Sequence, residues 1–324
     1  MKEELKIVCL GGGIGTVQLL RGLRPYSKNI TVVCSMADDG GSGGRLRRLF
    51  SIPPPGDLIN CLAALSDAEP ILCQLLTFRF AGDRWGKDDS LRGQKLGNLI
   101  LVALTSLTGS FEKGLKEAER VFLCHGQILP ATCENVSVWA KTVEGKHIFG
   151  EENIDLGRYN GVRALSEVHL EPKKVSTPKG VLTAIEEAEV IIAGPGDLYT
   201  TTLPVLLVPQ IRQAIKKSKA CKIFVVNVAN KPFETPHYKI SDYLGALKKH
   251  CSEVLFDYFL VNTNFKPKLP PRLNYEYVAS TDARVCEFNV KVIKKDLVEK
   301  TFPLYHNPEK IAQAILAIVK KRGE

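Results

Sequence analysis

Acidic, glycine-rich and basic residues are packed together in residues 37–62. Asp38 and Asp39 end an apolar, strand-like segment at 30–36. The five small residues that follow are Gly40, Gly41, Ser42, Gly43 and Gly44. Because glycine lets backbone N–H groups approach an anion closely, this stretch predicts a loop that cradles a phosphate. An ordinary surface turn is the alternative, since Asp-Gly sequences also favour turns.

Basic side chains and a helix start complete the same run. Arg45 and its neighbours Arg47 and Arg48 either bind the anion or form the solvated face of a short helix. Asp57 follows three prolines and Gly56, where its carboxylate can cap a helix that continues to about residue 80.

A strand, a glycine loop and a helix also open the chain. The apolar segment 6–10 precedes Gly11, Gly12, Gly13, Gly15 and Thr16, and an amphipathic helix follows. This order is the first turn of a nucleotide-binding unit, although the spacing G-x-G-x-G falls short of the full dinucleotide fingerprint. An acid at the end of the next strand can hold a ribose, which keeps NAD as an alternative. A paired Asp38-Asp39 instead favours phosphate or Mg²⁺, because hard cations prefer oxygen ligands.

A second glycine loop lies far along the chain. The strand-like segment 189–193 ends in Gly194, Gly196, Asp197, Tyr199 and Thr200, and a later strand at 222–227 ends in Asn227. If the sheet is parallel, these loops share its carboxyl edge, where open α/β sheets bind ligands. The sequence therefore predicts two glycine loops converging on one ligand.

The remaining elements frame this edge. Residues 95–107 form a nearly all-apolar helix that is expected in a core, and Asn98 near its start is either a cap or a ligand contact. A polar loop is expected at 81–94. Residues 120–150 read as short antiparallel strands inserted on the main sheet. His125 and His147 in that insertion have no partners at metal-ligand spacing and are expected to be structural. A helix at 309–320 closes the chain.

Composition narrows the class of protein. The 324 residues are 44% hydrophobic and 24% charged, as in ordinary globular proteins, and could form one large domain or two. The formal net charge of +9 suits anionic ligands, but no aromatic-interleaved basic stripe indicates nucleic acid. The nine cysteines include no C-x-x-C pair, and no apolar run is long enough for a signal peptide or a membrane span. A cytoplasmic protein is expected.

At this point the motifs resemble one family, the YvcK-type gluconeogenesis factors. They read, in chain order, GGGIGTVQLLRGL, ADDGGSGGRLR, PPPGDLINCLAALS and AGPGDLYTTTLPVLLVP, and the tail YHNPEKIAQAI resembles the family's closing Arg-His-Asn element. The superfamily includes the CofD phospholactate transferases, which use a guanine nucleotide donor with Mg²⁺. The resemblance implies one α/β domain over 1–324, with a Rossmann-like three-layer α/β/α fold, a mostly parallel sheet and a small antiparallel β insertion.

The resemblance also implies a function. This branch is expected to bind a uridine diphosphate sugar, to act in cell shape and envelope synthesis on gluconeogenic carbon, and to have no catalysed reaction. The alternative is a Mg²⁺-dependent transferase of phosphorus-containing groups. Expected partners are therefore a nucleotide or nucleotide sugar and, less directly, a second copy in a homo-oligomer, with no nucleic acid.

Site residues follow by matching motifs. Besides those of the two glycine loops and the acidic run, the expected ligand-binding residues are Asp57, Asn60, Asn98, Asn227, Tyr277, Tyr305 and His306. Asp38 and Asp39 are the expected metal ligands. This chain departs from the family at Ile14, where Thr is usual, at Gln94, where His is usual, and in the run NVANKPFET. It also has Tyr305 where the family has Arg, which weakens the expected contact with a diphosphate.

Overall fold

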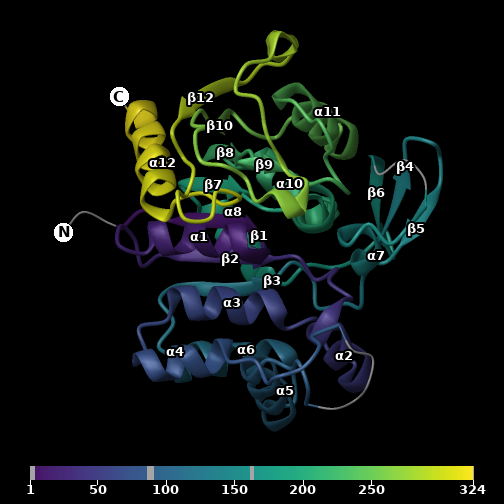
Figure 1. The fold of residues 1–324 in the computed structure, drawn as a ribbon. Helices are drawn as coiled ribbons and strands as arrows, with labels where there is room; N and C mark the ends of the chain where they lie inside the picture. The colour runs from purple at the N-terminus through teal and green to yellow at the C-terminus, as the bar shows by residue number, and fades with distance from the viewer. Residues whose placement is uncertain (1–3, 86–90, 161–163, 324) are drawn as a thin grey trace.

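The computed structural model describes residues 4–85, 91–160 and 164–323 (Figure 1). Residues 86–90 of the loop expected at 81–94 lie outside this part. Seven parallel strands form the main sheet in the order β12-β10-β8-β7-β1-β2-β3. Their bounds are β1 Ile7–Gly11, β2 Ile30–Cys34, β3 Gln127–Pro130, β7 Val190–Ala193, β8 Cys221–Val225, β10 Tyr258–Asn262 and β12 Lys291–Lys295.

Unbroken apolar runs explain why the central strands are parallel. Every residue of β1, β2 and β7 is buried. Strands of this kind need cover on both faces, which the helices provide, so the expected Rossmann-like α/β/α fold is confirmed. The described helices are α1 Gly13–Leu23, α2 Gly41–Phe50, α3 Gly56–Leu65, α4 Pro70–Thr77, α5 Leu96–Thr108, α6 Phe111–Val121, α7 Glu151–Asp155, α8 Lys179–Glu187, α9 Leu203–Leu206, α10 Pro209–Lys217, α11 Ile240–Cys251 and α12 Pro308–Gly323.

The order in which strands are added to the sheet reverses between β1 and β7. From β1 the chain builds outward through β2 to β3, and it then returns to β7 and builds the other way. The register pairs Gly11 with Cys34 and Leu10 with Ala193, so the loops after β1, β2 and β7 leave the sheet at one edge. Ligands of doubly wound sheets bind at such a switch point.

The antiparallel insertion exists but differs from the expected segment 120–150. β4 (Ser137–Thr142) lies between β5 (His147–Phe149) and β6 (Leu165–Glu171), so the small sheet extends beyond residue 150. β3 instead joins the main sheet parallel to β2, and residue 121 ends α6 rather than starting a strand. Short β-prone pieces carry no signal for which sheet they join, because pairing is decided by distant partners. A further antiparallel pair joins β9 (Ala229–Asn230) to β11 (Glu276–Tyr277).

Three helical expectations also change. The single helix expected over 57–80 is two helices, α3 and α4. Proline has no backbone N–H to donate within a helix but is tolerated in the first turn, so Pro70 begins a new helix instead of continuing the first. The glycines after Asp39 form the first turn of α2 rather than an open loop. Only one side of α5 is buried, and Leu107 remains 83% exposed, so α5 is a surface helix and not a core helix.

Candidate functional site

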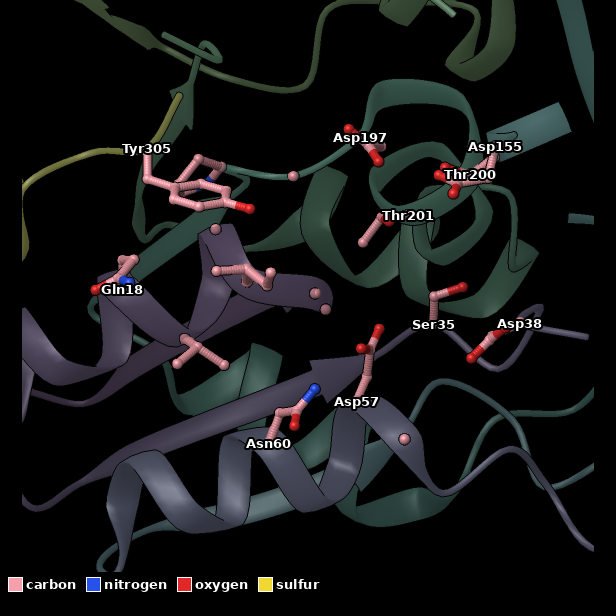
Figure 2. Close-up of a pocket in the computed structure, with 18 of the residues that line it drawn as sticks. Gln18, Ser35, Asp38, Asp57, Asn60, Asp155, Asp197, Thr200, Thr201 and Tyr305 are labelled. Atoms are coloured by element: carbon pink, nitrogen blue, oxygen red, sulfur yellow. The ribbon is translucent and has the colours of Figure 1, made fainter. Parts of the chain in front are cut away.

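A cavity of about 680 Å³ opens at the β1–β7 switch point. The predicted site residues that line it are Gly12, Gly13, Gly15, Asp38, Gly40, Ser42, Asp57, Asn60, Asn98, Gly196, Asp197, Thr200, Asn227, Tyr305 and His306. Figure 2 shows Asp57 and Asn60 on α3, Ser35 and Asp38 after β2, and Asp197 with Thr200 and Thr201 on the opposite wall. The two glycine loops therefore converge, as the sequence predicts.

Eight predicted residues lie outside this lining. They are Gly11, Thr16, Asp39, Gly41, Arg45, Gly194, Tyr199 and Tyr277. Tyr199 is buried, and its hydroxyl bonds with the Tyr238 hydroxyl at 2.8 Å. The Tyr277 hydroxyl donates to the Pro267 carbonyl at 2.6 Å. These side chains support the walls of the cavity and do not face it.

The start of α1 is held by a carboxylate. Asp57 accepts a hydrogen bond from the Gly13 N–H, and a Cβ on Gly12 would lie only 2.3 Å from Asp57 Oδ2. Asp57 therefore does not cap its own helix, α3, whose N-cap residue is Pro55. The sequence predicts a phosphate where the structure has Asp57, because a helix N-terminus attracts either anion.

Asp38 and Asp39 point to different places. Asp39 Oδ1 accepts the Glu152 N–H at 2.9 Å and joins the loop after β2 to α7. Asp38 lines the cavity instead, where removal from bulk water and the charge of Asp57 raise its pKa to about 7. The expected metal ligands Asp38 and Asp39 therefore do not face one cavity, since neighbouring residues in an extended loop point to opposite sides. The carboxylate that shares the cavity with Asp38 is that of Asp57.

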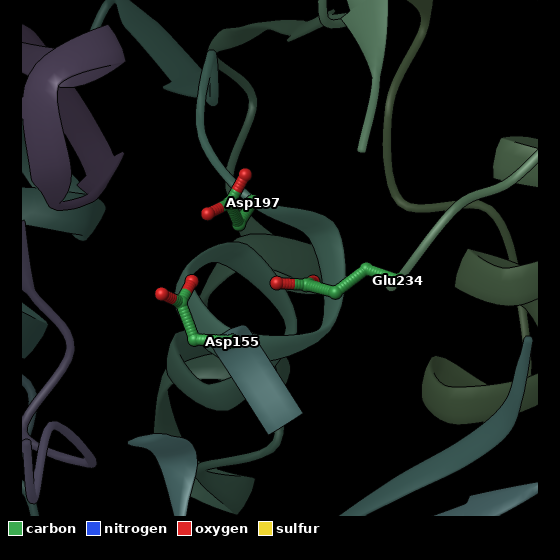
Figure 3. Close-up of side chains that lie close together, drawn as sticks. All are labelled: Asp155, Asp197 and Glu234. Carbon is green, nitrogen blue, oxygen red and sulfur yellow. The ribbon is translucent and has the colours of Figure 1, made fainter. Parts of the chain in front are cut away.

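Three carboxylates from distant segments lie close together (Figure 3), and the ammonium group of Lys231 lies among them. Asp155, Asp197 and Glu234 have oxygen atoms within 4.8 Å of one another, a spacing that suits a cation. Lys231 Nζ contacts all three, at 2.7 Å from Asp197 and 3.6 Å from Glu234, and bonds directly with Asp155. Burial lowers the pKa of Lys231, but these charges outweigh it and raise the pKa well above its usual value. The cluster holds its own cation.

A neutral histidine lines the cavity. His306 is 2% exposed, and burial lowers its pKa to about 4. Its ring bonds with the Val226 backbone, while Nε2 has no hydrogen-bond partner among the described residues. A buried ring nitrogen of this kind is available to a ligand.

Sequence reasoning missed several charged residues of the cavity wall. They are Arg21, Arg79, Arg84, Lys95, Glu151, Asp155 and Lys231. None of them lies in a glycine-rich loop or at metal-ligand spacing, so the local sequence does not mark it. Lys95 offered the clearest signal, because a lone lysine precedes an apolar helix.

The model of a family described as 2-phospho-L-lactate transferase CofD matches residues 7–298. The chain belongs to the CofD family. It is 37% identical over 330 residues to the gluconeogenesis factor of Bacillus subtilis, which covers 99% of this chain and 100% of that protein. It is 38% identical over 322 residues to the gluconeogenesis factor of Halalkalibacterium halodurans, covering 98% and 97%.

A solved relative has the same fold. A crystal structure of a Bacillus halodurans protein is 37% identical, matches with a TM-score of 0.88, and covers 97% of this chain and 100% of that one. Together these relatives place the chain in the gluconeogenesis-factor branch of the CofD family, as its motifs indicate. Among the described helices, none is long and apolar enough to cross a membrane.

Proposed function

We propose that this CofD-family protein binds a nucleotide sugar of the uridine diphosphate type and acts as a regulator of the gluconeogenesis-factor kind. The observation that carries the proposal is the cavity at the switch point, where both glycine loops meet. Its volume of about 680 Å³ lies within the range of sites for small ligands, roughly 300–1,000 Å³. The names of the relatives, gluconeogenesis factors, support the link to gluconeogenesis. The proposal extends this link to cell shape and envelope synthesis on gluconeogenic carbon.

The polar wall suits a sugar. Asn60, Asn227 and neutral His306 offer amide and imidazole groups, and the acids around them accept hydrogen bonds from hydroxyls. Isothermal titration with UDP-N-acetylglucosamine, GDP and NAD tests the proposal. Binding of the UDP-sugar is expected, whereas binding of NAD alone would refute it.

A Mg²⁺-dependent transferase is the second candidate. It is favoured by the family description and by Asp38 and Asp57, which face one cavity and form no ion pair with a described residue. Phosphorus NMR of the protein with a guanine or uridine nucleotide and an acceptor alcohol separates the candidates. If the protein is a regulator, the phosphorus spectrum of the nucleotide should stay unchanged over hours. If it is a transferase, the signal of the phosphorylated acceptor should appear.

These two carboxylates fit a hard divalent cation, since the charge of each raises the energy of the other when both are ionised. Bound there, Mg²⁺ would neutralise the acids and a nearby diphosphate. We expect Mg²⁺ at pH 8 to tighten UDP-sugar binding roughly tenfold relative to EDTA. The gain should shrink below pH 7, because protons compete for Asp38.

Two variants make this prediction specific. Asp38→Asn should lose the Mg²⁺ effect, whereas Asp39→Asn should keep it, because the Asp39 carboxylate is directed at Glu152. Calorimetric affinities measured with Mg²⁺ and with EDTA provide the test. An effect of Mg²⁺ that survives in Asp38→Asn would place the ion elsewhere.

The departure at Tyr305 gives another prediction. Tyr305 lines the cavity and stacks on Phe302, with ring centroids 5.2 Å apart. Its hydroxyl can donate one neutral hydrogen bond, whereas arginine can donate two charge-assisted ones, a difference of about 1.4 kcal/mol. Tyr305→Arg should therefore tighten UDP-sugar binding roughly tenfold.

Salt separates this effect from a steric one. The gain for Tyr305→Arg should shrink between 50 and 500 mM NaCl, a change that shortens the screening length about threefold. Tyr305→Phe, which keeps the stacking and loses the hydroxyl, should weaken binding by about 1 kcal/mol, roughly fivefold. Weaker binding by the arginine variant, or a gain unaffected by salt, would show that Tyr305 does not replace the family's cation.

A further inference from the structure

Two cations face each other at the edge of the cavity. Arg79 and Lys95 form an isolated antiparallel bridge between the end of α4 and the start of α5. The bridge is fixed by hydrogen bonds from the Phe80 N–H to the Gln94 carbonyl and from the Leu96 N–H to the Phe78 carbonyl, both 2.9 Å. This pattern makes 79 and 95 a non-hydrogen-bonded pair, the arrangement with the shorter distance between side chains.

The hydrogen bonds of these two side chains go to neutral acceptors and give neither charge an ion-pair partner. Arg79 Nη1 donates to Ser42 Oγ at 3.0 Å and to the Gly93 carbonyl at 2.7 Å. Lys95 Nζ donates to Asn60 Oδ1 at 2.6 Å. All three acceptors are neutral, and within the described ranges neither cation forms an ion pair with a carboxylate. Like charges directly opposite in an antiparallel pair destabilise it.

Lys95 is buried as well as close to the positive charge of Arg79. It is 7% exposed, and both Arg79 and Lys95 line the cavity. Burial, followed by the charge of Arg79, lowers the pKa of Lys95 to about 8, while Asp57 opposes that change. A buried cation beside a second cation is costly unless an anion is bound there for part of the protein's working cycle.

A third group at this corner also lacks a partner. Asn98 lies about one helical turn after Lys95. It lines the cavity and is 1% exposed. Its side-chain oxygen has no hydrogen-bond partner among the residues that the structure describes. A buried acceptor of this kind points to a ligand hydroxyl beside the anion.

We propose that Arg79 and Lys95 bind the phosphate of the ligand, with Asn98 accepting a hydrogen bond from an adjacent hydroxyl. The glycine loop at α1 is not the phosphate site, because the Asp57 carboxylate already takes the Gly13 N–H. This inference rests on the proposed function only in placing the ligand in this cavity. The ligand class is therefore a phosphorylated sugar or nucleotide sugar whose phosphate lies on the α4–α5 side.

Paired probes test the inference. Calorimetry with UDP and with uridine measures what the phosphates add to affinity. Lys95→Gln and Arg79→Gln should each weaken UDP binding at least tenfold and leave uridine binding within twofold. Lys113→Gln, which removes an exposed charge from α6, should change neither. Equal losses for UDP and uridine, or no loss for UDP, would overturn the inference.

The pH dependence identifies Lys95. UDP binding to the unchanged protein should weaken between pH 7 and 9, because Lys95 loses its proton around its pKa of about 8. The Lys95→Arg protein should bind UDP as tightly at pH 9 as at pH 7, because arginine stays protonated over this range. Arg79, Arg84, Asp57 and Asp38 also act on Lys95, and Asp38 titrates near pH 7, so only the difference between the lysine and arginine proteins counts. Identical slopes for both proteins would contradict the role of Lys95.

Pyrophosphate separates this inference from the proposed function. Millimolar pyrophosphate should raise the melting temperature of the unchanged protein by several degrees and have no effect on Lys95→Gln. If it does so while UDP-sugars fail to bind, the anion site stands and the nucleotide-sugar function falls. If UDP-sugars bind the unchanged, Lys95→Gln and Arg79→Gln proteins equally, the function stands and the anion site falls.

Discussion

Lys231→Met is expected to lower the free energy of unfolding by about 3–5 kcal/mol, since removing one partner leaves the other buried charges uncompensated. Lys231 Nζ is the cation shared by Asp155, Asp197 and Glu234, and these residues tie α7, the loop after β7 and the loop after β9 together. Denaturant unfolding followed by circular dichroism measures the loss. Lys231→Arg keeps the charge and should lose much less, and the exposed Lys217→Met should be nearly neutral.

The loss of unfolding free energy in Lys231→Met should depend on pH. With the lysine present, burial and the charge of Asp197 already raise the pKa of Glu234 to about 7. A carboxyl whose pKa is higher in the folded than in the unfolded state costs stability above its folded pKa, and the cost disappears as pH falls toward the unfolded value. The stability lost by Lys231→Met should therefore be largest at pH 8 and smaller at pH 5. A deficit that is below 1 kcal/mol at pH 8 would show that the ammonium is not needed to hold these acids together.

Gly15→Ala is expected to weaken UDP-sugar binding about a hundredfold, the scale of effect produced by shifting binding groups by about 1 Å. Gly15 lies on α1, and a Cβ there would be 2.4 Å from the Pro195 carbonyl oxygen. Ordinary contact begins at 3.4 Å, so the two glycine loops must move apart by about 1 Å (3.4 − 2.4). The overpacking should also cost about 1–3 kcal/mol of stability.

A helix interior offers the matched control. Gly245 lies within α11, and no atom stands within 4 Å of a Cβ built on it. Gly245→Ala should therefore stabilise the protein by about 0.5–1 kcal/mol, as alanine does in a helix, and leave affinity unchanged. If Gly15→Ala behaves like Gly245→Ala, the contact between the two glycine loops does not shape the ligand site.

Much of the framework was predictable from local sequence. The apolar runs at β1, β2 and β7, each followed by glycine or acid, predicted a parallel sheet with loops at one edge, and the motif order predicted the CofD family. These signals work because strand formation, chain reversal and close backbone approach depend on residues near one another. The same reasoning correctly brought Gly12, Gly196 and Asn227 to one cavity.

The electrostatics of the site were decided by tertiary structure. The sequence offered Asp38 with Asp39 as a pair, but the fold turns Asp39 toward Glu152 and brings Asp57, from the start of α3, to the Gly13 N–H. It also joined β3 to the main sheet, where local pattern had placed an antiparallel strand. Neighbours in sequence separate here because an extended chain directs consecutive side chains to opposite sides.

By itself, then, the sequence determined the family, the parallel α/β framework and the edge of the sheet at which the cavity opens, since each depends on short-range patterns. Only the tertiary structure placed Lys231 among acids that lie up to 76 residues away, and set Arg79 opposite Lys95. The physical reason is that charges interact through space, and their partners come from segments whose meeting depends on the packing of the entire sheet. The chemistry of the cavity wall is a property of the fold.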